Sequence, residues 1–157
     1  MTFRTFLLAQ AFGIAAFNVA INSAYTSYLW GAEQQLALGE VSADLAMTPI
    51  WIGLLSVLLG TFFIRKAFAD GTMLRDAGIT SHPVFSRLPR NVLPRSVVVA
   101  VLCAIAFALP LFLALPLIGD GVLTPVNAIG TKAIITLLFS LLIVPLIVYA
   151  TTADVVQ

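Results

Sequence analysis

Six polar residues stand at regular intervals inside two long apolar stretches, and they are the residues best placed to bind or react. They form two sets with a spacing of four, namely Asn18, Asn22 and Thr26, and Lys132, Thr136 and Ser140. A spacing of four puts each set in one stripe along the face of an α-helix. Amides, hydroxyls and an ammonium arranged in this way can hold a small polar ligand. We therefore take all six as candidate ligand-binding residues.

A structural interpretation of the same six residues competes with the ligand hypothesis. Asn, Ser and Thr commonly form hydrogen bonds between packed membrane helices, each contributing about 0.6 kcal/mol. The long side chain of Lys132 can extend toward a membrane interface while its methylenes stay in apolar surroundings. The sequence favours this structural role over ligand binding.

Catalytic chemistry has little support in the sequence. Paired carboxylates inside an apolar run, His or Cys at metal-ligand spacing, and a glycine-rich phosphate loop are all missing. The single His82 and the single Cys103 have no second ligand at a useful spacing. We predict no catalytic residue, no metal site and no cofactor, and a protein that is not an enzyme.

Four apolar runs must position the polar residues, and they span about 6–30, 47–64, 96–118 and 133–150. Each has about the ~20 residues that a helix needs to cross a bilayer. The composition agrees, with 61% hydrophobic residues, 10% charged residues and a mean hydropathy of +1.07. These numbers predict one all-α domain over 1–157, an integral membrane four-helix bundle. The first run is longer than the apolar core of a signal peptide, so we expect it to remain as a span.

The basic residues predict an orientation. Six of the eight Lys and Arg lie between the second and third runs: Arg65, Lys66, Arg75, Arg87, Arg90 and Arg95. The positive-inside rule puts this loop, about 68–94, and both termini in the cytoplasm. The predicted topology is N-in/C-in, in a cytoplasmic (inner) membrane. Both polar stripes then occupy the outer half of the bilayer, where the first and fourth spans, if neighbours, would form an outward-facing polar cleft.

Three arginines near the third run predict a contact with lipid headgroups. Arg87, Arg90 and Arg95 lie among proline and apolar residues beside the bilayer. Clusters of four to eight basic residues are the usual signal for anionic lipid. An ordinary positive-inside anchor is therefore the alternative interpretation, and the sequence favours it.

A possible internal repeat relates the second and fourth runs. A shift of 84 residues places Ile50 on Ile134, Leu54 on Leu138, Ser56 on Ser140 and Asp70 on Asp154. Two equivalent helical hairpins in parallel orientation would result. Apolar sequences also match one another through composition alone, so both explanations stay open.

Two function classes follow from these observations. The first is a non-enzymatic structural or accessory subunit that packs into a membrane assembly. The alternative is a small oligomeric carrier or channel that uses the outward-facing cleft for a polar or amphipathic ligand. In both cases we expect the partners to be the lipid bilayer and either further copies of the chain or a larger membrane complex. A net charge of +1 gives no reason to expect nucleic acid.

Overall fold

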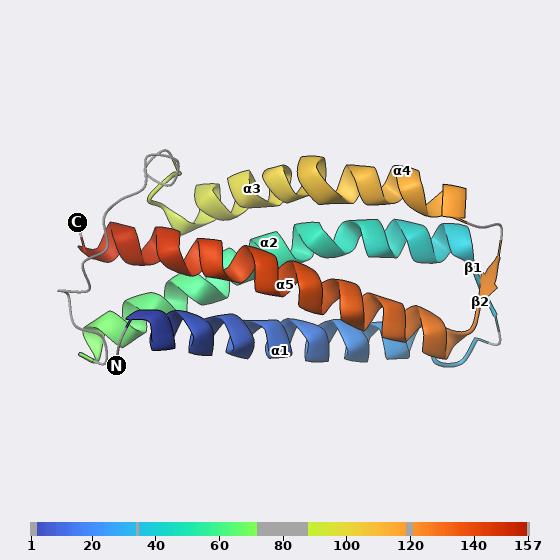
Figure 1. The fold of residues 1–157 in the computed structure, drawn as a ribbon, viewed down its shortest axis with the longest axis horizontal. Coiled ribbons are helices and arrows are strands. Elements are labelled where there is room, and N and C mark those ends of the chain that lie inside the picture. The colour runs from blue at the N-terminus through green and yellow to red at the C-terminus, as the bar shows by residue number, and fades with distance from the viewer. Residues whose placement is uncertain (1–2, 34, 72–87, 119–120, 157) are drawn as a thin grey trace.

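A computed structural model describes residues 3–33, 35–71, 88–118 and 121–156, and four helical rods make up most of it (Figure 1). Three rods are the single helices α1 (Phe3–Trp30), α2 (Leu38–Ala69) and α5 (Pro125–Val156). The third apolar run forms α3 (Val92–Cys103), the π-helical segment η2 (Ala104–Ala108) and α4 (Leu109–Ile118). Two short strands, β1 (Leu36–Ala37) and β2 (Val122–Leu123), precede α2 and α5.

All four rods are long and apolar enough to cross a membrane, as the sequence predicts. The helices extend beyond the predicted runs, most of all at the start of α2. That helix begins at Leu38, so Glu40 and Asp44 belong to its first turns and not to a loop. Acidic side chains are favourable there because the N-terminal end of a helix carries a partial positive charge. Most of the predicted cytoplasmic loop, with His82 and Arg87, lies outside the described residues.

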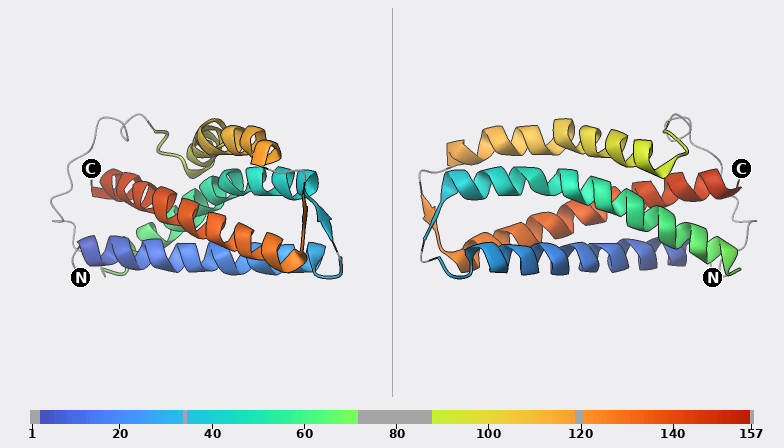
Figure 2. Two further views of the ribbon diagram at one scale, coloured as in Figure 1. Left: turned by 45° about the vertical axis from the view of Figure 1, so that its right-hand side comes forward. Right: turned by 180° about the vertical axis from the view of Figure 1, so that it is seen from behind.

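The two long helices α2 and α5 cross at the centre of the bundle (Figures 1 and 2). The helix α1 packs mainly on α5, whereas α3, η2 and α4 pack on α2. One hairpin consists of α1 and α2, and the other consists of the third rod and α5. The first rod of each hairpin therefore packs on the second helix of the other. Two hairpins with matching roles result, the arrangement that the 84-residue shift predicts.

The bundle has two distinct ends. At one end β1 and β2 pair antiparallel, Leu36 opposite Leu123 and Ala37 opposite Val122. We call this the strand end. The N- and C-termini lie together at the opposite end, which we call the terminal end (Figure 1). Four rods that alternate in direction bring the two termini to the same end.

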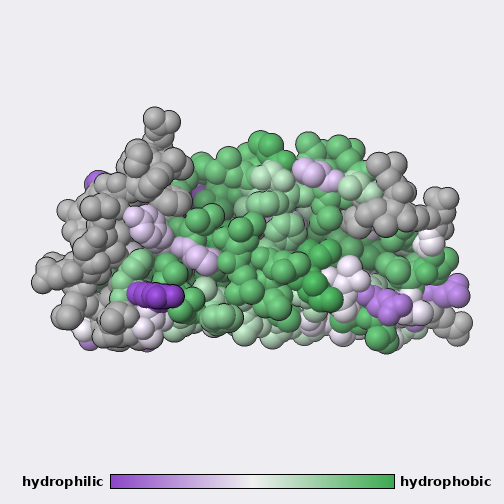
Figure 3. Space-filling view, in the orientation of Figure 1, coloured by the Kyte–Doolittle hydropathy of each residue, from purple (hydrophilic) through white to green (hydrophobic). Residues whose placement is uncertain are grey.

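Three apolar clusters fill the interior along the length of the bundle. The first, near the terminal end, includes Phe6, Ile64 and Val148. The second, in the middle, includes Ile52, Val57 and Ile147. The third, near the strand end, includes Trp30, Val41 and Leu45. The outer surface is also apolar. In Figure 3 hydrophobic residues cover the middle of the visible face, and the most hydrophilic ones gather near the two ends. A bundle that is apolar both inside and outside suits lipid as its solvent.

The third rod changes helix type just before a proline. Residues Ala104–Ala108 are π-helical, and Pro110 follows in α4. Proline lacks the N–H that would bond back to a carbonyl in the preceding turn, and its ring crowds that carbonyl. A wider π turn accommodates the proline without ending the helix. The rod therefore continues to Ile118.

Candidate functional site

Asn18 is the centre of a buried polar cluster that joins three helices. Its Nδ2 donates to Ser56 Oγ of α2 at 3.2 Å and to Ser140 Oγ of α5 at 3.0 Å. All three side chains are at most 1% exposed. We call Asn18, Ser56 and Ser140 the polar seam. The two serines are the pair that the 84-residue shift matches, and they bond to the same amide.

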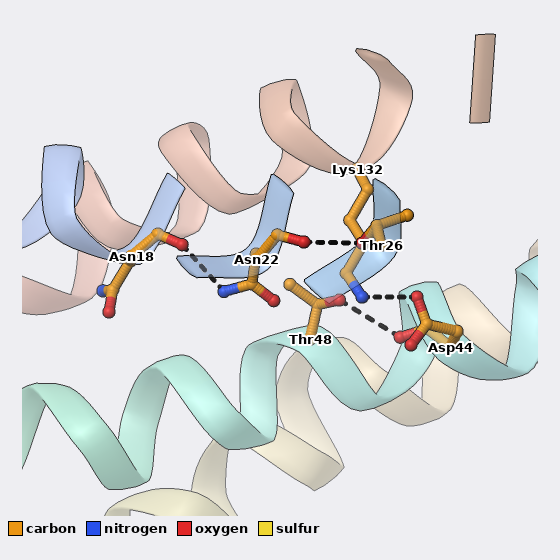
Figure 4. Close-up of polar contacts among 6 residues, drawn as sticks. All are labelled: Asn18, Asn22, Thr26, Asp44, Thr48 and Lys132. Carbon is orange, nitrogen blue, oxygen red and sulfur yellow. Dashed lines mark hydrogen bonds and ion pairs between the residues drawn. The ribbon is translucent and has the colours of Figure 1, made fainter. Parts of the chain in front are cut away.

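The polar stripe of α1 continues from the seam toward the strand end through bonds within the helix. Asn22 Nδ2 donates to the Asn18 carbonyl at 2.9 Å, and Thr26 Oγ1 donates to the Asn22 carbonyl at 2.6 Å (Figure 4). Side chains that bond to a carbonyl one turn earlier satisfy their donors locally. Thr26 is fully buried, whereas Asn22 is only half-buried.

Lys132 forms a buried ion pair that ties α5 to α2. Its Nζ lies 2.5 Å from Asp44 Oδ2, with 3% of the lysine side chain and 24% of the aspartate side chain exposed. The same Nζ lies 5.3 Å from the centre of the Tyr25 ring and 5.9 Å from that of Trp30. Thr48 Oγ1 donates to the Asp44 carbonyl at 3.1 Å, on the same face of α2 (Figure 4).

The burial of this charged pair has a physical explanation. A buried ion is costly unless a counter-ion and further contacts offset its lost hydration. Asp44 supplies the counter-charge, and two aromatic rings supply cation–π contacts to the ammonium. Lys132 is therefore held among α1, α2 and α5 and contributes to their relative placement.

A groove of about 430 Å³ opens between α1 and α2 beside this ion pair. Its lining residues combine acceptors, aromatic rings and apolar side chains; they are Ile21, Asn22, Tyr25, Asp44, Met47, Thr48, Trp51, Leu55 and Lys132. The sequence places its predicted cleft between the first and fourth spans, but α1 and α5 pack closely along that line. Only Lys132 comes to the groove from α5.

The six predicted ligand-binding residues divide into two groups. Asn22 and Lys132 line the groove, whereas Asn18, Thr26, Thr136 and Ser140 are buried away from it. Within the part of the chain that the structure describes, the buried Thr136 Oγ1 has no hydrogen-bond partner. In the stripe of α5, Lys132 therefore lines the groove, Ser140 belongs to the polar seam, and Thr136 carries the unpaired hydroxyl.

The three predicted headgroup arginines also separate. Arg95 is buried, and it donates from Nε to the Pro89 carbonyl at 2.8 Å and from Nη1 to Thr151 Oγ1 at 3.3 Å. It therefore links the start of α3 to the end of α5. Arg90 is exposed, and Arg87 lies outside the described residues.

Sequence reasoning missed Asp44, Thr48, Trp51 and Leu55 as members of a site. Their spacings of four, three and four put them on one face of α2. This signal is readable in the sequence, but the predicted second run begins at residue 47 and leaves Asp44 outside it. The helix start at Leu38 is the fact that brings Asp44 onto the same face as the others.

Over residues 3–33, 35–71, 88–118 and 121–156 there is no group of three His, Cys, Asp or Glu side chains that could hold a metal ion.

Comparison of the chain with known protein families, with characterised proteins and with solved structures found no match.

Proposed function

We propose that this chain is a non-enzymatic multi-pass membrane protein that serves as a structural or accessory subunit of a membrane assembly. The observation that carries the proposal is the polar seam, in which Asn18 bonds to serines of two other helices in a dry interface. Polar groups inside a span that satisfy one another stabilise a bundle and leave no polar path through it.

The third rod supplies the surface for such an assembly. Among the long helices it packs mainly on α2, and it touches α5 at a few places such as the Phe107–Phe139 ring contact. Its remaining surface carries a run of exposed aliphatic side chains: Val97, Val101, Leu102, Ile105, Leu109 and Leu113. A face of this kind fits against lipid or against the helices of a neighbouring subunit.

The assembly role is tested by the mass of the protein after extraction from its own membrane in a mild detergent. We expect a mass well above the 16.7 kDa of one chain. Ile105→Trp should reduce that mass by adding bulk to the third rod, whereas Leu138→Trp, equally exposed on α5, should not. A protein that runs as one chain before any substitution contradicts the proposal.

The proposed orientation is N-in/C-in in the cytoplasmic membrane, with the strand end facing outward. Its support is the placement of Arg65, Lys66 and Arg90 near the terminal end and of Glu40 near the strand end. We predict that cysteines replacing Gln35 and Asp70, both exposed, react with an impermeant thiol reagent from opposite sides of the membrane. Cys103→Ala should be the background. Labelling of both positions from one side would exclude four crossings.

A second candidate is the small oligomeric carrier or channel, and the groove between α1 and α2 is the observation that favours it. The groove joins polar groups near the strand end to apolar side chains deeper in the bundle. Four helices rarely enclose a pathway alone, so this function requires several copies of the chain. An assembly made only of this chain favours the carrier, and one that contains a different membrane protein favours the accessory role.

A further inference from the structure

The groove has the length and the polarity gradient of a lipid site. Asp44 lies near its strand end, and Leu55 lies about 16 Å further along α2 at 1.5 Å per residue. Half the hydrocarbon thickness of a bilayer is about 15 Å. The charged groups lie at one end of this length, Asn22 and Trp51 lie between, and Leu55 lies toward the other end. A headgroup and the first part of an acyl chain need this order of surfaces.

The polar end of the groove is electrically neutral but presents both charges. Lys132 and Asp44 cancel, and Asp44 is the more accessible partner at 24% against 3%. An ammonium has three N–H donors, so the bond to Asp44 leaves Lys132 with donors for a second acceptor. Asn22 uses its Nδ2 on a backbone carbonyl and keeps its side-chain oxygen as an acceptor.

Two aromatic rings flank these groups. Tyr25 on α1 and Trp51 on α2 line the groove, and each is 52% exposed. Aromatic faces attract an ammonium, and tryptophan is the strongest of them. Tyrosine and tryptophan are also the residues typical of the membrane interface.

We propose that the groove binds one zwitterionic phospholipid of the leaflet at the strand end. Asp44, with the rings of Tyr25 and Trp51, receives the ammonium of the headgroup, and Lys132 receives its phosphate. One acyl chain lies along Trp51 and Leu55. The proposal shares its groove with the carrier alternative but requires no transport, and it goes beyond the assembly role.

Charge selects the zwitterion over an anionic lipid. The Lys132–Asp44 pair is already neutral, so an anionic headgroup would bring an uncompensated negative charge beside Asp44, the more exposed member of the pair. A ligand that carries both charges matches both members of the pair, and a mismatch of charge is a basis for discrimination. The pair therefore recognises a phosphate and an ammonium held a short distance apart.

The test is native mass spectrometry of the full chain mixed with equal amounts of phosphatidylethanolamine and phosphatidylglycerol with identical acyl chains. We expect one phosphatidylethanolamine to be retained, about tenfold more tightly than phosphatidylglycerol. Trp51→Ala should weaken its retention on the order of tenfold. Phe12→Ala is the matched control, because Phe12 is 60% exposed on α1 and does not line the groove.

Asp44→Asn tests the charge argument. It keeps the size of the side chain and removes its charge, so the preference should move toward phosphatidylglycerol. Three results overturn the proposal: no retained lipid, a preference of the unsubstituted chain for phosphatidylglycerol, or equal losses in Trp51→Ala and Phe12→Ala. If Asp44→Asn does not fold, the comparison of Trp51→Ala with Phe12→Ala decides. A large assembly without bound lipid rejects the lipid site alone, and a single chain that holds the lipid rejects the assembly role alone.

Discussion

Asp44→Ala is expected to lower the free energy of unfolding by about 3–5 kcal/mol, because it leaves the ammonium of Lys132 buried without its counter-ion. Lys132 is 3% exposed and is enclosed by Tyr25 and Trp30 as well as by α2. Reversible unfolding in mixed detergent micelles measures the change. The loss should be the largest of any single replacement of a polar residue in the bundle.

Two controls separate the ion pair from a general effect at the start of α2. The double substitution Asp44→Ala with Lys132→Met should recover most of the lost stability, because it removes the buried charge along with its partner. Glu40→Ala, one turn earlier and exposed, should change stability by no more than about 0.5 kcal/mol. If Asp44→Ala behaves like Glu40→Ala, the buried pair does not hold α5 to α2.

Gly53→Leu is the second substitution with a large expected effect, at about 3 kcal/mol of destabilisation. Gly53 is buried where α2 meets α3, and a Cβ at this position would stand 2.9 Å from Cys103 Sγ and 3.4 Å from Val99 Cγ1. A leucine there must push the third rod away from α2. The same unfolding measurement applies.

The matched control for this contact is Gly13→Leu on α1. A Cβ at Gly13 meets nothing within 4 Å, so leucine should be neutral or should stabilise the helix by up to about 1 kcal/mol. Cys103→Ala should also restore part of the stability that Gly53→Ala loses, since it removes the sulfur that the new Cβ meets. Similar losses from Gly53→Leu and Gly13→Leu would show that α2 and α3 do not approach closely.

The number and character of the helices were predictable because lipid imposes simple rules. A span needs about ~20 apolar residues and satisfies its backbone internally, so the four apolar runs translate directly into four helices. The structure confirms four helices of this length and apolarity. The beginning of α2 was predicted less well because Glu40 and Asp44 resemble a loop. The side chain that neutralises Asp44 belongs to Lys132, 88 positions away, and one helix gives no sign of that partner.

The candidate site was predictable only in some of its members. Spacing alone shows that Asn18, Asn22 and Thr26 share a face of α1. It does not show which helix covers that face. The crossing of α2 and α5 brings both Ser56 and Ser140 to Asn18. One turn further along α1, Asn22 lines the groove between α1 and α2. The angle at which two helices cross depends on how their side chains fit along the contact. The spacing of polar and apolar residues within one helix carries no information about that fit.

In this structure α1 and α5 meet in a buried polar interface, while the accessible groove lies between α1 and α2. Single cysteines at Asn18, Asn22, Met47 and Ser140, in a Cys103→Ala background, test it with a small impermeant thiol reagent applied at the strand end. We expect reaction at Asn22 and Met47, which line the groove, and none at Asn18 and Ser140, which are at most 1% exposed. A cysteine at Leu138, which is exposed on α5 outside the groove and should face lipid, is also expected to stay unreacted. Reaction at Asn18 and Ser140, with none at Met47, would instead place the open cleft between α1 and α5 and exclude the buried interface.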